Sequence, residues 1–155
     1  MTRKSIVWRV AKVTAMSREF LPGQIIAYPY LWAWQNDRGE TDGRKSRPTC
    51  VVVAVRSAKD GLTHLALLAV TTQPPQLDRA AIEVPDTEAR RAGLTDLKRC
   101  WIMVDEYNYD IAERSWYIEP DGNVLGRFSK AFMMKIAASF GEASRKSGRR
   151  INRLD

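Results

Sequence analysis

Two apolar segments lying close together in the chain constrain the fold most strongly. Residues 49–56 read Thr-Cys-Val-Val-Val-Ala-Val-Arg, and residues 63–71 read Thr-His-Leu-Ala-Leu-Leu-Ala-Val-Thr. Continuous runs of β-branched and aliphatic residues predict strands that are covered on both faces. The sequence Lys-Asp-Gly at 59–61 supplies a turn, and the two prolines at 74–75 end the second run because proline cannot donate to a strand ladder. We therefore expect an antiparallel hairpin.

Four shorter segments also predict strands, because they combine β-branched and aromatic residues and are bounded by turn residues. They are residues 24–30, 81–84, 98–104 and 115–118, the last followed by a turn at 121–122. The segment 31–47 between the first two strands is polar and long, and we expect a functional loop there. In residues 1–19 a short amphipathic helix is an open alternative.

Two segments predict helices. Residues 85–92 should form a short helix capped by Asp86 or Thr87 and stopped by Gly93. A second helix should begin after Ser129, because apolar residues then repeat at three- and four-residue spacing as far as Phe140. We expect Gly141 to weaken its end and the tail from Ser144 onward to be loose. Many short strands and one closing helix predict a mainly β class, as a strongly bent sheet or barrel.

The 155 residues are expected to form one domain, with the positive charge gathered at its two ends. Residues 1–19 carry a net charge of +4 and residues 141–155 carry +3, which together equal the net +7 of the chain. Basic ends are typical of proteins with a polyanionic or acidic partner, although solvated tails are an equal alternative. We find no apolar run of about 18 residues and no signal peptide, so we expect a cytoplasmic protein that does not enter a membrane. Cys50 and Cys100 are expected to be buried free thiols.

Several kinds of catalytic chemistry are excluded by the residues themselves. A pair of catalytic histidines is impossible because His64 is the one histidine, and its place in an apolar strand predicts a structural role. Nucleophile elbows, zinc ligand clusters and glycine-rich phosphate loops do not occur, so we expect neither a metal nor another cofactor. Asp105, Glu106 and Asp110 could hold magnesium, but a solvated loop at a strand end is the stronger expectation.

One pair of strand ends offers a phosphate site. Arg47 immediately precedes the first apolar run, and Thr71 ends the second one. If the two strands are antiparallel neighbours, Arg47 and Thr71 meet at the same edge of the sheet, where a guanidinium and a hydroxyl can bind one phosphate. The alternative is a surface arginine and a threonine that caps its strand.

The sequence resembles the PemK/MazF family of toxins from residue 20 to residue 141. The motifs that carry the resemblance occur in order: Pro-Gly-Gln-Ile at 22–25, Arg-Pro at 47–48 before an apolar strand, an apolar strand ending at Thr71, Ile-Glu-Val-Pro at 82–85 with Gly-Leu at 93–94, and Leu-Gly-Arg at 125–127 before the last helix. The chain departs from the family at Gln24, where an acidic residue is usual. The basic extensions, residues 1–19 and 142–155, lie outside the matched domain.

The resemblance implies both a fold and an activity. The fold is an SH3-like β-barrel with a C-terminal helix, usually a homodimer. The activity is that of an mRNA interferase, a metal-independent endoribonuclease that cleaves single-stranded RNA and is silenced by a cognate antitoxin protein. The catalytic arginine and threonine of the family correspond to Arg47 and Thr71, with Thr72 taking the second role if the alignment shifts by one residue. The rival expectation is a module on the same barrel that binds nucleic acid or protein and cleaves nothing.

Further residues near this pair are expected to bind RNA. Aromatic rings can stack on unpaired bases, and basic side chains can contact phosphates. The candidates are Trp32, Trp34, Arg44, Lys45, Thr72 and Gln73, with Trp34 the better candidate for an exposed ring. An acidic, partly apolar segment of the antitoxin is expected to cover Arg47 and the 31–47 loop.

Overall fold

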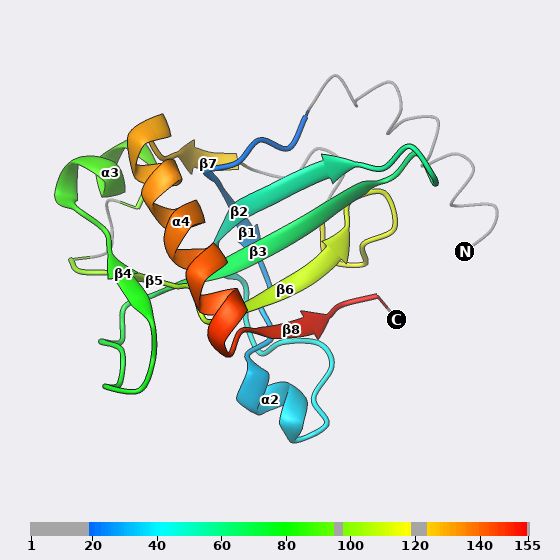
Figure 1. Ribbon diagram of the computed structural model, residues 1–155, viewed down its shortest axis with the longest axis horizontal. Helices are drawn as coiled ribbons and strands as arrows, with labels where there is room; N and C mark the ends of the chain where they lie inside the picture. The colour runs from blue at the N-terminus through cyan, green and yellow to red at the C-terminus, as the bar shows by residue number, and fades with distance from the viewer. Residues whose placement is uncertain (1–18, 95–97, 119–123, 155) are drawn as a thin grey trace.

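The expected hairpin is the central part of the fold. In the computed structural model, which describes residues 19–94, 98–118 and 124–154, β2 (Arg47–Arg56) pairs antiparallel with β3 (Thr63–Thr71) (Figure 1). Thr49 lies opposite Ala69 and Arg56 lies opposite Thr63. Apolar residues of β3 are buried on both faces, as the sequence predicts for a covered strand.

Eight strands form one sheet in the described part of the chain, so the prediction of a mainly β fold is confirmed. On one side of the hairpin lie β1 (Gln24–Tyr28) and then β7 (Val124–Arg127). On the other side of the hairpin, β3 pairs with two strands. Near its C-terminal end it pairs with β5 (Trp101–Met103), which pairs in turn with β4 (Ala81–Glu83). Near its N-terminal end it pairs with β6 (Glu106–Ile111), which pairs in turn with β8 (Arg149–Asn152). Only β6 and β8 pair in parallel within these ranges, and the sheet is not closed.

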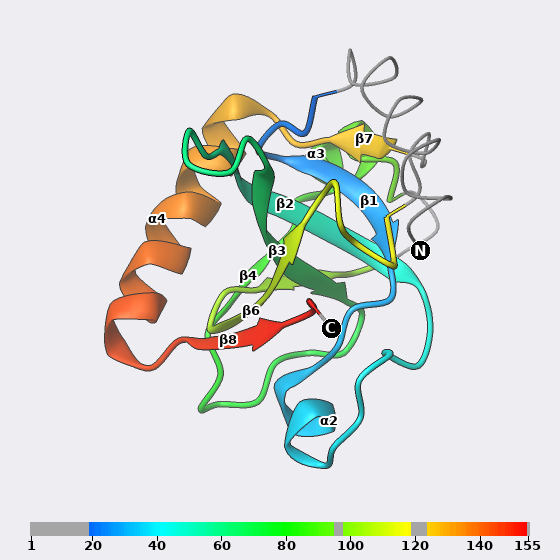
Figure 2. The same cartoon turned by 90° about the vertical axis from the view of Figure 1, so that its right-hand side faces the viewer.

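The sheet is bent where β3 changes partner. Thr71 pairs with Trp101, whereas Leu67 pairs with Asn108, so the register shifts by three residues between β5 and β6. A second irregularity occurs in β2 between Val51 and Val53. Extra residues on one strand of a pair bend that strand and increase its twist. Figure 2 shows the resulting curvature, with α4 standing on one side of the sheet and α2 near its lower end.

Helix α4 (Lys130–Lys146) covers one face of the sheet, as the sequence predicts. The Ser129 hydroxyl accepts a hydrogen bond from Phe132 N at 3.2 Å and so caps the helix. Phe132, Met133 and Ile136 are buried against the apolar side chains of this face. The opposite face carries a second core, which includes Phe20, Ile26, Tyr28, Tyr30, Val51, Leu65, Leu67 and Ile118.

Several sequence-based boundaries need correction. The strand expected at 98–104 is only the three residues of β5, and residues 115–118 form no strand. The helix α3 (Asp86–Arg91) begins after Pro85, and no side chain caps it, so the prediction of an Asp86 or Thr87 cap is wrong. The predicted stop at Gly93 is confirmed by its φ of +75°, a conformation that favours glycine.

The C-terminal expectations are also wrong. Helix α4 continues through Gly141 to Lys146, and the chain then enters β8 instead of a loose tail. Ile151 is buried against Leu31 and Ala33, so it anchors the end of the chain to the rest of the fold. The segment 142–154 is therefore part of the packed structure.

The long polar segment contains a helix that the sequence analysis did not predict. α2 (Ala33–Asp37) is only five residues long, and the buried Gln35 side chain accepts a hydrogen bond from Trp32 N at 3.0 Å. The possible helix in residues 1–19 and the turn at 121–122 lie outside the described residues, apart from Glu19. Among the helices that are described, none has the length and apolar character needed to cross a membrane.

Candidate functional site

The start of β2 and the end of β3 form the candidate site. Arg47 lies opposite Tyr28 of β1, and Thr71 lies opposite Trp101 of β5. Continuing the β2–β3 register two residues beyond the Thr49–Ala69 pair sets Arg47 opposite Thr71. Directly opposed residues of antiparallel strands point to the same face, with Cβ atoms about 4.5–5.5 Å apart. The fold thus puts the two side chains on one face at one edge.

Arg47 has an unusual environment for an arginine. It is partly buried, and its Nε atom is buried with no hydrogen-bond partner. Its guanidinium carbon lies 5.2 Å from the centre of the Trp32 ring. Arg44, Arg79, Arg99 and Arg149 pair with carboxylates, whereas Arg47 forms no ion pair within the described residues. Its donors are therefore available for an anion.

Burial also changes the ionisation of this side chain. Partial loss of water lowers the pKa of Arg47 from its ordinary value, and the neighbouring Tyr30 opposes the change. A bound phosphate would offset the cost of this desolvation, because it supplies a negative charge and hydrogen-bond acceptors that the protein does not provide for Arg47.

Thr71 is buried to 8% exposure, and its hydroxyl oxygen accepts a hydrogen bond from Gln73 N at 3.1 Å. This bond fixes the oxygen and leaves the hydroxyl proton for donation to another acceptor. Thr72 is exposed and follows the last residue of β3. Because successive side chains of a strand alternate between faces, the geometry favours Thr71 over Thr72 as the partner of Arg47. Gln73 is exposed beside them.

The two tryptophans of the 31–47 segment have different roles. Trp34 is 44% exposed, as expected, and the guanidinium carbons of Arg38 and Arg44 lie 5.1 and 4.8 Å from the centre of its ring. Trp32 is partly buried, packs edge-on against Tyr30 with centroids 5.1 Å apart, and supports Arg47. Lys45 is exposed between these basic residues in the sequence.

A buried polar layer holds this segment on the sheet. Glu106 Oε2 accepts hydrogen bonds from Tyr30 Oη at 3.2 Å and from Ala33 N at 2.9 Å. Asn108 binds both backbone groups of Leu31, with Leu31 N donating to Oδ1 and Nδ2 donating to the Leu31 carbonyl. Burial raises the pKa of Glu106, although the Ala33 hydrogen bond and the charge of Arg79 oppose the rise. This layer fixes the backbone on both sides of Trp32.

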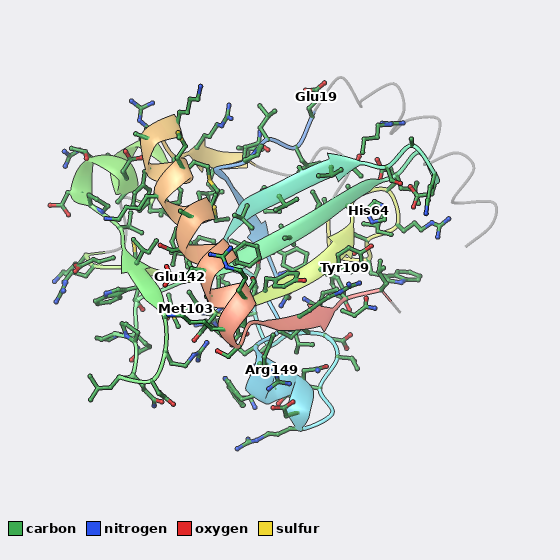
Figure 3. All side chains as sticks on the ribbon, in the orientation of Figure 1. Glu19, His64, Met103, Tyr109, Glu142 and Arg149 are labelled. Carbon is green, nitrogen blue, oxygen red and sulfur yellow. The ribbon has the colours of Figure 1, made fainter. Side chains whose placement is uncertain are left out.

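Arg153 completes the layer from the C-terminal end. It donates to the Pro29 carbonyl at 2.8 Å and to Asn108 Oδ1 at 2.9 Å. Its guanidinium also lies 4.2 Å from the centre of the Tyr117 ring. Arg149 of β8 adds two hydrogen bonds to Asp37 of α2, and it lies beside α2 in Figure 3. Sequence reasoning missed these residues, because no local pattern links residue 153 to residue 29.

The carboxylates at 105, 106 and 110 are neither a solvated loop nor a metal cluster. Glu106 and Asp110 are buried residues of β6, so the expectation of a solvated loop is wrong. Asp105 pairs with Arg79 through two contacts of 2.7 Å, and Asp110 accepts from Tyr28 Oη at 2.8 Å. Across residues 19–94, 98–118 and 124–154, no group of three His, Cys, Asp or Glu side chains is arranged to hold a metal ion.

His64 and the cysteines lie apart from this site. His64 contacts the Tyr109 hydroxyl at 2.6 Å and Asp60 at 2.9 Å, and Figure 3 shows His64 and Tyr109 close together. Cys50 and Cys100 are buried free thiols, as expected, and burial raises the pKa of Cys50 to about 12. Neither thiol is therefore suited to act as a nucleophile near neutral pH.

Comparison of the chain with protein-family models, with curated proteins and with solved structures finds no match. The chemistry of the site has to be judged from its own geometry. A cation with an unpartnered buried Nε, a fixed hydroxyl on the same face and an exposed aromatic ring close to two arginines can together bind a phosphodiester and an adjacent base.

Proposed function

We propose that this chain is the toxin of a type II toxin–antitoxin system, a metal-independent endoribonuclease of the PemK/MazF type. The observation that carries the proposal is the partly buried, unpartnered Arg47 on the same face as Thr71. Unsatisfied buried donors cost stability, so their presence at a strand edge favours a ligand over a purely structural role. The family motifs at 22–25 and 47–48 support the same assignment.

In the proposed reaction, the RNA supplies its own nucleophile. A 2′-hydroxyl attacks the adjacent phosphorus and loses its proton, while the bond from phosphorus to the 5′-oxygen breaks and that oxygen gains a proton. The products are a 2′,3′-cyclic phosphate and a free 5′-hydroxyl. Arg47 stabilises the charge that develops on the phosphorane, and Thr71 donates a hydrogen bond to one of its oxygens. The protein contributes positioning and charge.

The same proposal covers the finer details of fold and partners. A bent sheet followed by a helix on one face supports an SH3-like barrel, although the described strand pairings leave the sheet open. A homodimer, an acidic antitoxin segment over Arg47 and action on cytoplasmic RNA belong to this proposal. Trp34, Arg44 and Lys45 would contact the RNA beside the cleaved bond, with Thr72 and Gln73 at the adjoining edge.

Incubation of the purified protein with a long single-stranded RNA in EDTA tests the proposal. We expect cleavage at a defined short sequence, with 2′,3′-cyclic phosphate ends. A substrate carrying a 2′-deoxy nucleotide at that position should stay intact, because the nucleophile is missing.

Two other outcomes would contradict the proposal. Cleavage that requires magnesium would exclude the metal-independent reaction. RNA that stays intact while expression still arrests growth would support the rival function, a binding module that acts on a protein.

A further inference from the structure

A groove of roughly 700 Å³ lies beside the N-terminal half of α4. Its lining residues Val52, Phe128 and Met133 belong to the core on the face of the sheet that α4 covers, opposite the face that carries Arg47 and Thr71. Figure 1 shows α4 on that face. Its lining combines apolar and basic side chains, and the residues are Pro22, Val52, Arg91, Arg127, Phe128, Ser129, Lys130, Met133, Met134 and Ala137.

Apolar side chains along this groove remain exposed. Met134 on α4 is 64% exposed, although its neighbour Met133 is buried. Along β2, Val53 and Val55 are 38% and 54% exposed. Val53 pairs with Ala66, which packs in the core under α4, so the exposed valines continue the apolar surface on the same side of the sheet. An apolar patch with a polar rim is typical of a protein interaction site.

The charged side chains that line the groove are all basic. Arg91 comes from α3, Arg127 from β7 and Lys130 from α4, and no acidic residue lines the groove. Within the described residues, none of the three forms an ion pair with a carboxylate. The nearby Glu88 is already engaged, since its carboxylate accepts hydrogen bonds from the backbone N and the hydroxyl of Ser129. Three cations from three elements thus line the groove together with apolar side chains.

We propose that this groove is the docking site for an acidic amphipathic helix of a partner protein. Apolar side chains of the helix would occupy the groove beside Met134, and flanking carboxylates would pair with Arg91, Arg127 and Lys130. A second copy of this chain fits less well, because it would bring the same three cations to the contact. RNA also fits less well, because the single aromatic ring in the lining, Phe128, is buried and cannot stack on a base. The inference goes beyond the proposed function, since it concerns the opposite face.

Fluorescence anisotropy with a labelled peptide tests the inference. The probe is a helical peptide of about four turns, with leucines along one face and glutamates beside them; a matched peptide carries lysine at each glutamate position. We expect micromolar binding of the acidic peptide to the full chain, and no binding of the basic one. Lys130→Glu and Met134→Asp should each weaken binding about tenfold or more.

Two variants serve as controls. Lys135→Glu changes an exposed cation of α4 that does not line the groove, and it should leave binding unchanged. Arg47→Ala should leave unchanged the part of the binding that Met134→Asp removes, which separates this groove from the site at Arg47. Equal binding of both peptides, or no binding, would overturn the inference. If sedimentation shows a dimer that Met134→Asp dissociates, the groove is instead the contact with a second copy. If RNA displaces the peptide and Lys130→Glu abolishes this displacement, the groove binds nucleic acid.

Discussion

At the scale of single residues, the ion pairs of Arg79 should make the stability of the fold depend on pH. Arg79 binds Asp105 and the buried Glu106. Burial raises the pKa of Asp105, but the hydrogen bonds from Arg79 and from Ala80 N, together with the charge of Arg79, outweigh this effect and hold that pKa below its usual range. A depressed carboxyl pKa contributes stability above the unfolded value of about 3.9, and this contribution is lost as the pH falls through the folded value.

We therefore predict that Arg79→Met costs about 3 kcal/mol near neutral pH, because it leaves a buried carboxylate without its cation. The cost should shrink as the pH falls, first as Glu106, whose pKa burial raises, becomes protonated, and further below about pH 4 as Asp105 does. Urea unfolding at several pH values measures this dependence. Arg99→Met is the matched control, since the Arg99–Glu83 pair is exposed and should matter little at any pH. A cost that is independent of pH would contradict the coupling.

Trp34 provides a second test at this scale. Its ring is exposed and contacts Arg38 and Arg44, so its removal should leave the folded core intact. Stacking on an aromatic ring contributes about 1–3 kcal/mol per base, and Trp34→Ala should therefore weaken RNA binding by about tenfold or more. Trp116→Ala removes another exposed tryptophan and should have no such effect. A large fall in Tm for Trp34→Ala would instead assign the ring a structural role.

At the scale of elements, the C-terminal strand is predicted to hold the site together. β8 buries Ile151 and is followed by Arg153, which binds the Pro29 carbonyl and Asn108. Deleting residues 149–155 should lower the Tm strongly and reduce RNA cleavage as well. Arg153→Met should cost about 2 kcal/mol, because buried acceptors lose their donor. The control is Arg150→Met, since Arg150 is exposed on the same strand. A deletion that leaves both Tm and cleavage unchanged would show that β8 does not support the site.

Local patterns predicted those elements whose apolar side chains face a core in a regular repeat. The hairpin of β2 and β3 and the cap at Ser129 are of this kind. β6 was missed because its buried side chains, Glu106, Asn108 and Asp110, are polar, whereas the buried side chains of a strand are usually apolar. They accept hydrogen bonds from residues 28–31 on the other side of the fold. Such partners are distant in sequence and leave no local signal.

The candidate site was predictable in part for the same reason. Arg47 and Thr71 could be paired from strand order alone, because antiparallel neighbours bring the start of one strand to the end of the next. The unsatisfied Nε of Arg47 and its contact with Trp32 depend on the folded loop, and so did not follow from the sequence. Helix α2 is too short to give a periodic signal.

At the scale of the whole molecule, the two faces of the sheet have different chemistry. One face carries Arg47, Thr71 and the tryptophan-rich segment, which form the proposed RNA site. The other carries α4 and the groove lined by Arg91, Arg127 and Lys130. Ligands of the two faces should therefore bind independently, unless the partner reaches around an edge of the sheet.

The central claim is that Arg47 is the cation of an RNA-cleaving site, and one comparison tests it most directly. Cleavage of single-stranded RNA in EDTA is measured for the wild type, for Arg47→Ala and for Arg56→Ala, which removes the exposed arginine at the other end of β2. We predict a loss of about 10²–10³-fold for Arg47→Ala, as for removal of a donor to a developing oxyanion, and none for Arg56→Ala. The Tm of Arg47→Ala should equal or exceed that of the wild type, because an unpartnered buried donor is removed. Undiminished cleavage by a folded Arg47→Ala protein would contradict the account.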